Sequence, residues 1–77
     1  MSREQKEQGI QLRERIYQYI SNYIRDMGYS PTVREIGNAV GLKSSASVYK
    51  HLTLLEIEGR IESKPNCPRT IKIIEKW

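Results

Sequence analysis

The feature that most constrains this fold is the short interval between two helix signals in the middle of the chain. Thr32 and Glu35 have the spacing of a capping box, in which each residue satisfies a free backbone donor of the other. The helix that they start is predicted over residues 33–40, and Gly41 ends it. The next helix signal follows almost at once, so only a tight turn fits between the two helices. This spacing is typical of a helix-turn-helix unit.

The second helix of this unit is predicted to run from an N-cap at Ser44 or Ser45 to Gly59. Three apolar residues recur at helical spacing and define its buried side: Val48, Leu52 and Leu55. The opposite side and its flanks carry small, hydroxyl-bearing and basic side chains: Ala46, Ser47, Tyr49, Lys50 and Thr53. His51 lies on the shoulder of the buried side, so we interpret it as a packing or hydrogen-bonding residue.

A longer amphipathic helix is predicted before this unit. Its apolar residues recur every three or four positions: Leu12, Ile16, Tyr19, Ile20, Tyr23, Ile24 and Met27. Gly28 follows as a left-handed cap. Tyr17 lies off this stripe and is expected to face solvent. Residues 1–9 are polar and have no apolar face, which predicts a flexible lead-in.

After Gly59 the pattern changes to two short strands. Residues 60–63 and 70–73 alternate polar with apolar side chains, and residues 64–69 hold two prolines and one asparagine, which favour a turn. A hairpin after a helix-turn-helix is a wing. The predicted fold class is therefore mainly α: a three-helix winged helix-turn-helix with a C-terminal two-stranded β-hairpin wing over residues 10–74. Residues 75–77 are expected to form a C-terminal tail.

Composition limits the function classes. The chain has 77 residues, enough for one small domain, and no apolar run near the roughly 18 residues that span a bilayer. The single cysteine, Cys67, cannot form an internal disulfide, which favours a reducing, cytoplasmic compartment. With one histidine, no zinc-cluster spacing and no glycine-rich phosphate loop, we expect no enzyme, metal, cofactor, membrane or small-molecule substrate.

The distribution of charge indicates nucleic acid more clearly than the net charge of +4. No acidic residue lies between Glu35 and Glu56, and none lies in residues 63–74. If the fold joins these two stretches, they form one positive face. Chance is the alternative, because small basic proteins often lack acids locally. A helix N-terminus with small residues also suits phosphate, since its backbone N–H groups are free.

Five residues are predicted to contact DNA phosphates and so to position the protein rather than to specify sequence: Thr32, Arg34, Lys43, Lys64 and Arg69. If about five phosphates are neutralised, log K should fall with log salt at a slope of roughly −4 to −5. Arg34 has an alternative role as one partner of an ion pair on a solvated helix face.

Several runs of this sequence resemble the LexA-type SOS repressors, a bacterial and phage family. Residues 28–37 (GYSPTVREIG) resemble the segment leading into the second helix, and residues 41–52 (GLKSSASVYKHL) resemble the recognition helix. Residues 59–61 and 68–71 match the exit from that helix and the wing, so the resemblance covers about residues 10–74. It implies a winged helix-turn-helix that binds double-stranded operator DNA, an inverted repeat, as a homodimer and represses transcription.

The resemblance also implies that five residues at the start of the third helix touch base edges: Ser44, Ala46, Ser47, Tyr49 and Lys50. The Ala46 methyl suits a thymine methyl, and Ser47 can donate or accept a hydrogen bond. Lys50 can reach guanine O6 and N7, a pairing worth ~1–3 kcal/mol of discrimination. Tyr49 and Lys50 are bulkier than the short residues often found at such positions, so the operator is expected to differ.

The resemblance leaves two matters open. Family members carry a second, self-cleaving domain with a serine–lysine pair, and this chain has no room for one, so we expect no peptidase activity. The chain is then either the excised DNA-binding domain of a longer repressor or a free-standing relative. Leu54 and Ile57 lie away from the buried side, and we expect them to contact a missing domain or Trp77 in preference to the alternative, another protomer. The alternative function is a winged-helix module that binds protein without specific DNA binding, and the retained lysines count against it.

Overall fold

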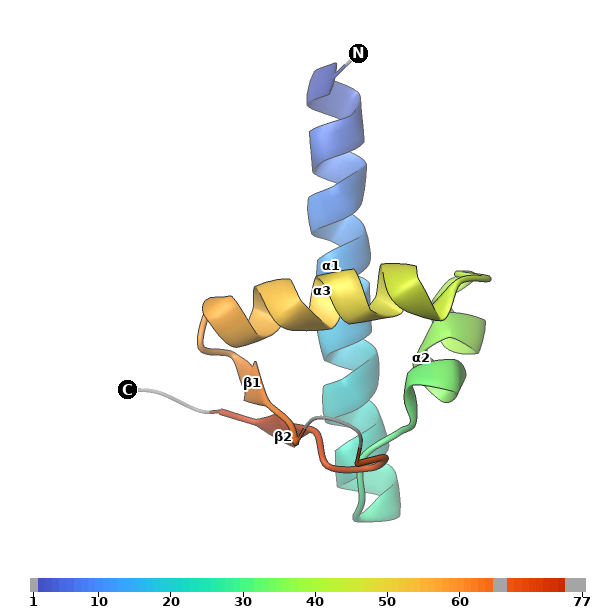
Figure 1. The fold of residues 1–77 in the computed structure, drawn as a ribbon, viewed down its shortest axis with the longest axis vertical. Helices are drawn as coiled ribbons and strands as arrows, with labels where there is room; N and C mark the ends of the chain where they lie inside the picture. Colours follow the sequence, from blue (N-terminus) through green and yellow to red (C-terminus); the bar gives the residue numbers. More distant parts are fainter. Residues whose placement is uncertain (1, 65–66, 75–77) are drawn as a thin grey trace.

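The computed structural model, described for residues 2–64 and 67–74 with side chains from residue 9, contains three helices and one two-stranded antiparallel sheet (Figure 1). The elements follow in the order α1 (Ser2–Met27), α2 (Val33–Val40), α3 (Ser45–Ile57), β1 (Ile61–Glu62) and β2 (Lys72–Ile73). Helix α3 crosses the middle of α1, with α2 beside one end of α3 and the sheet beside the other (Figure 1). The predicted fold class is confirmed.

Helix α1 supplies one wall of the core. Ile16 and Ile20 are fully buried, and three further members of the predicted stripe pack against the core: Leu12, Tyr19 and Ile24. The helix ends at Met27, and Gly28 caps it with an N–H bonded to the Ile24 carbonyl at 2.8 Å and a left-handed φ of 82°. The last stripe residue is an exception, because Met27 is 53% exposed.

Two predictions about α1 were wrong. The helix begins at Ser2, well before Leu12, the first residue of the predicted apolar stripe, so residues 2–9 have helical backbone. Glutamate, glutamine, lysine and arginine are good helix formers, and a polar segment can extend a helix without an apolar face. Tyr17 is half-buried and packs against the core instead of facing solvent. Its ring lies under the Arg60 guanidinium, 4.0 Å from the ring centroid, and this distant partner left no local signal.

The helix-turn-helix unit forms as predicted. Thr32 Oγ1 accepts from the Glu35 N–H at 3.1 Å, and Glu35 Oε1 accepts from the Thr32 N–H at 2.8 Å, which confirms the capping box. Helix α2 ends at Gly41, which has a φ of 81°. Gly37 lies at the contact between the helices, where an added Cβ would stand 3.0 Å from the Leu42 carbonyl oxygen.

Helix α3 has its N-cap at Ser44 and ends at Ile57, slightly before the predicted stop at Gly59. Glu58 is the C-cap, and the chain turns through Gly59 with a φ of 75°. The three residues predicted for its buried side are buried: Val48, Leu52 and Leu55. They meet the buried residues of α1, α2 and the hairpin: Ile16, Ile20, Ile36, Val40, Ile61 and Ile71.

The hairpin is the predicted wing, and we use that name for residues 60–74. Its strands pair Ile61 with Ile73 and Glu62 with Lys72. Across the connecting segment, the Lys64 N–H donates to Thr70 Oγ1 at 3.0 Å, and the Thr70 hydroxyl donates to the Cys67 carbonyl at 2.9 Å. Of the predicted turn 64–69, residues 65–66 lie outside the described residues, as does the predicted tail 75–77.

Ion pairs connect α1 to the base of the wing and to the end of α3. Arg60 bonds to both carboxylate oxygens of Glu14, one of them at 3.1 Å, and this hydrogen bond holds the pKa of Glu14 below its usual range. Arg13 pairs with Glu58 at 3.3 Å.

Within the described part of the chain, no helix has the length and apolarity needed to cross a membrane.

Candidate nucleic-acid interface

The start of α3 presents the predicted base-reading residues on the surface. Four of the five side chains are exposed: Ser44, Ala46, Tyr49 and Lys50. The fifth, Ser47, is half-buried. Tyr49 is 57% exposed, which is high for a large aromatic residue. The Ser44 side chain forms no capping hydrogen bond, so its hydroxyl is not committed to the helix end. This turn of helix therefore offers polar atoms and one aromatic ring to a partner.

A groove of ≈ 570 Å³ separates α3 from the wing. Its walls come from α2, α3 and the wing: Val33, Tyr49, Leu52, Thr53, Glu56, Ser63, Lys64, Cys67, Pro68, Thr70 and Ile71. Tyr49 was predicted to read bases and Lys64 to contact a phosphate, so the fold brings one residue of each kind to a single groove. The two acid-free stretches meet here, although Glu56 adds one carboxylate to the groove.

Four of the predicted phosphate contacts have exposed side chains: Arg69, and the three residues Arg34, Lys43 and Lys64. Arg34 forms no ion pair with any side chain that the structure describes, which speaks against its alternative role in a surface pair. Thr32 differs from these three because its Oγ1 accepts the capping hydrogen bond from Glu35. Its hydroxyl proton is still available to a phosphate oxygen.

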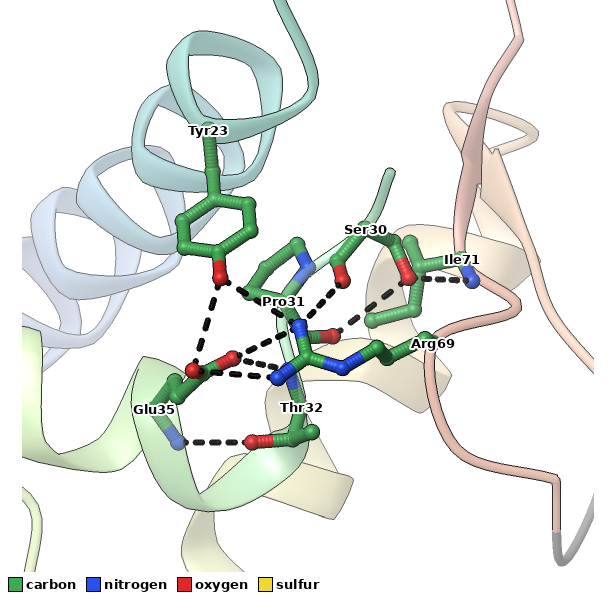
Figure 2. Close-up of polar contacts among 7 residues, drawn as sticks. All are labelled: Tyr23, Ser30, Pro31, Thr32, Glu35, Arg69 and Ile71. Atoms are coloured by element: carbon green, nitrogen blue, oxygen red, sulfur yellow. Dashed lines mark hydrogen bonds and ion pairs between the residues drawn. The ribbon is translucent and has the colours of Figure 1, made fainter. Parts of the chain in front are cut away.

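Arg69, the fifth predicted phosphate contact, is bonded within the protein (Figure 2). Its Nη1 donates to the Tyr23 hydroxyl at 3.2 Å and to the Ser30 carbonyl at 3.1 Å. Its Nη2 donates to Glu35 Oε2 at 3.3 Å, and Nη1 lies 3.1 Å from Glu35 Oε1. The guanidinium also lies over the Tyr29 ring, 5.0 Å from its centroid. Local sequence patterns missed this arrangement because its partners are 34 to 46 positions away.

A buried serine completes this cluster. Ser30 is 4% exposed, and its Oγ accepts from the Ile71 N–H at 3.2 Å while donating to the Pro31 carbonyl at 3.4 Å. We call Tyr23, Ser30, Glu35, Arg69 and Ile71 the wing junction (Figure 2). In the sequence, Ser30 belongs only to residues 28–37, the segment that leads into the second helix, and a serine beside a proline gives no signal for a partner 41 positions away.

The electrostatics of the wing junction favour its charged forms. The hydrogen bond from the Thr32 N–H is the main cause that holds the pKa of Glu35 below its usual range, and the Arg69 guanidinium lowers this pKa further. Hydrogen bonds to Tyr23 and Glu35 raise the pKa of Arg69. Arg69 is thus a cation whose charge is met by a carboxylate of the same molecule, and it contributes less to the positive face than the sequence count suggests.

His51 lies between the surface and the core. Its side chain is half-buried, and Nδ1 is buried with no hydrogen-bond partner among the described residues. Burial, foremost, lowers the pKa of His51, and the nearby charges of Arg13 and Lys50 lower it further. The packing interpretation agrees with this placement, while no hydrogen bond to Nδ1 is found.

The other chemistry-bearing residues are peripheral. Cys67 is a free, exposed thiol on the groove wall, and the described residues contain no cluster of metal-ligand type. Leu54 is half-buried, and Ile57 is 75% exposed, so only Ile57 stands clear of the molecule as predicted. Their predicted partner Trp77 lies outside the described residues.

Comparison with known proteins gives a consistent result. The family model described as LexA DNA binding domain matches residues 11–70. The LexA repressor of Staphylococcus aureus (strain Newman) is 52% identical over 59 residues, which are 77% of this chain and 28% of that repressor. The LexA repressor of Staphylococcus haemolyticus (strain JCSC1435) is 49% identical over 61 residues, 79% of this chain and 30% of that protein.

A third relative comes from another genus. The LexA repressor of Desulfitobacterium hafniense (strain DSM 10664 / DCB-2) is 50% identical over 60 residues, 78% of this chain and 29% of that repressor. The chain therefore spans less than a third of the length of the curated relatives it matches.

Proposed function

The chain belongs to the LexA DNA-binding domain family, and we propose that it binds double-stranded DNA with sequence specificity and represses transcription. The observation that carries the proposal is the groove between α3 and the wing. One wall holds Tyr49 and Thr53 of α3, and the other holds Lys64 at the wing. If α3 lies in the major groove and the wing lies beside it, the groove between them can hold one strand of the DNA backbone.

In this mechanism α3 enters the major groove and reads base edges with five side chains: Ser44, Ala46, Ser47, Tyr49 and Lys50. Helix α2 crosses the backbone with its N-terminus toward a phosphate, where its free N–H groups and partial positive charge are favourable. Arg34, Lys43 and Lys64 are exposed and add charge to the contact. Lys64 lies on the wing and contacts a phosphate of the flanking DNA strand.

The partner is an inverted-repeat operator that two copies occupy, in keeping with an SOS-type repressor. A single domain on a half-site binds weakly, because it lacks the gain in effective concentration that tethering two half-site contacts provides. The family match covers the DNA-binding part of its relatives alone, and we assign no catalytic residue to this chain.

Selection of bound duplexes from a random pool at low salt tests the proposal. Enrichment of a short motif, above all as an inverted repeat, supports specific reading, and uniform recovery contradicts it. Failure to recover any duplex would direct attention to a protein partner, with exposed Ile57 as the first surface to change.

A paired substitution tests the assignment of the reading residues. Lys50→Ala with Tyr49→Ala removes the two largest exposed side chains at the start of α3 without touching the core. We expect the selected motif to lose preference at one or more positions, because the lost contacts discriminate between bases. An unchanged motif would rule these two residues out as readers. Arg15→Ala, an exposed position on α1, is the matched control.

A further inference from the structure

We propose that Arg69 is a positioning residue, which holds the wing in the pose that binds DNA and does not contact DNA itself. The inference rests on the proposed DNA binding and adds a role that charge alone would not assign. The competing role is the direct phosphate contact predicted for Arg69 from its sequence position. The contacts of the wing junction favour positioning.

The hydrogen bonds of Arg69 carry the first part of the argument. Both Nη1 donors are used, one by the Tyr23 hydroxyl and one by the Ser30 carbonyl, and Nη2 donates to Glu35 (Figure 2). These acceptors come from α1, from the segment between α1 and α2, and from α2. One guanidinium therefore joins the wing to three parts of the helical body.

The weakness of the wing's own pairing carries the second part. Its two strands have two residues each, and they form two residue pairs. An isolated hairpin this short is marginally stable, so the orientation of the wing depends on its contacts with the helical body, which include the buried side chains of Ile61 and Ile71. The Ile71 N–H, bonded to Ser30 Oγ at 3.2 Å, and the Arg69 fork lie on the same side of the connecting segment (Figure 2). They fix the segment that leads from Lys64 and Cys67 back into β2.

Charge balance makes the two roles distinguishable. Glu35 lies 3.1 Å from Arg69, so a phosphate would have to compete with a carboxylate already in place. If Arg69 bound phosphate, removing the Glu35 charge would free the guanidinium and remove a repulsive acid, and DNA binding would strengthen. If Arg69 positions the wing, the same change loosens the wing, and DNA binding weakens.

The test is fluorescence anisotropy of the 77-residue chain on its selected duplex at several salt concentrations. Three variants cut the wing junction at different points: Arg69→Gln, Glu35→Gln and Tyr23→Phe. Glu35→Gln keeps an oxygen for the Thr32 N–H, so the capping box survives. We expect each to weaken binding roughly two- to fivefold, the range of exposed ion pairs, with an unchanged slope of log K on log salt.

Three outcomes would overturn the inference. One is tighter binding by Glu35→Gln, and another is a slope reduced by roughly 0.9 in Arg69→Gln, the signature of one lost phosphate contact. The third is additive loss in Arg69→Gln with Glu35→Gln, because partners of one contact should give a double variant little worse than either single one. Lys64→Ala shows what a lost phosphate contact looks like, and Arg15→Gln is the matched arginine control.

A measurement without DNA separates this inference from the proposed function. Hydrogen exchange at the Ile71 amide reports whether its bond to Ser30 Oγ opens. We expect faster exchange there in Arg69→Gln, with core amides such as that of Leu55 unchanged. Unchanged exchange at Ile71 would overturn the positioning role. If the unmodified chain bound no duplex, the proposed function would fail while this readout still decided the role of Arg69.

Discussion

At the scale of single residues, two glycines in helices have opposite surroundings. Gly37 is buried where α2 meets the turn and α3, and an added Cβ would lie 3.0 Å from the Leu42 carbonyl and 3.3 Å from Val48 Cγ2. Gly9 in α1 has no atom within 4 Å of the same position. The close approach of the two helices therefore depends on the missing side chain at Gly37.

Alanine at each glycine should change stability in opposite directions. Gly37→Ala should lower the free energy of unfolding by ~1–3 kcal/mol, because a backbone oxygen must move to admit the methyl. Gly9→Ala should raise it by ~0.5–1 kcal/mol, because alanine favours the helix and meets nothing. Urea denaturation measures both. Equal changes in the two variants would contradict the packing role of Gly37.

His51 should make stability depend on pH. Burial is the main cause that lowers the pKa of His51 in the folded chain from 6.5. Near that pH the unfolded chain therefore binds more protons than the folded chain. The contribution of neutral His51 is fully present above pH 6.5 and is lost as pH falls through the lowered folded pKa. His51→Gln should flatten this part of the curve in thermal unfolding. A parallel curve for the variant would show that another group titrates.

At the scale of elements, the two helices of the helix-turn-helix begin in different ways. Thr32 caps α2 with its side chain, and Glu35 completes the box. Ser44 caps α3 with no side-chain hydrogen bond. Both helices begin after a hydroxyl-bearing N-cap residue, but only the start of α2 is closed by side-chain hydrogen bonds. The start of α3 is left open at the surface proposed to meet DNA.

Removing the hydroxyl of each N-cap residue should lower the free energy of unfolding by different amounts at the two helix ends. Thr32→Ala should lower the free energy of unfolding by ~1 kcal/mol, the usual cost of a lost N-cap bond. Ser44→Ala should change it by less than about 0.5 kcal/mol, as for a surface substitution without a specific contact. Urea denaturation of both variants is the measurement. Equal losses would mean that the Ser44 hydroxyl also caps its helix in solution.

Most elements could be predicted because their signals are local. The apolar stripe of α1, the capping box and the alternation of the strands each lie within a few residues, where helix and strand periods are visible. The start of α1 was not predictable in this way, since residues 2–9 have helical backbone without an apolar face. The ring of Tyr17 was misplaced because its partner, Arg60, comes from the wing.

At the scale of the whole molecule, the positive face is smaller than the sequence count of basic residues. The fold does bring residues 36–55 and 63–74 to one groove, as the charge pattern suggested. However, Arg69 is paired with Glu35, and Glu56 also lines the groove. Pairings between residues this far apart depend on the tertiary fold, so the contact of Arg69 with Glu35 could not be predicted from the sequence.

The exposed lysines should determine the salt dependence of DNA binding. Replacing Lys43 and Lys64 together with alanine should reduce the slope of log K on log salt by roughly two, about 0.9 for each lost phosphate contact. Affinity should fall uniformly across duplexes, because phosphate contacts carry no sequence information. Anisotropy titrations at several salt concentrations measure the slope. A changed sequence preference with an unchanged slope would assign these lysines to base reading instead.

The bond between Ile71 and Ser30 has a consequence for the order in which the molecule assembles. It joins residues 41 positions apart, whereas the capping box and the turn close over only a few positions. Long loops cost more chain entropy to close, so the helices should associate first and the wing should close last. Pulse-labelled exchange during refolding should protect the amides of α3 before that of Ile71. In that order, α3 is formed and packed before the wing closes beside it.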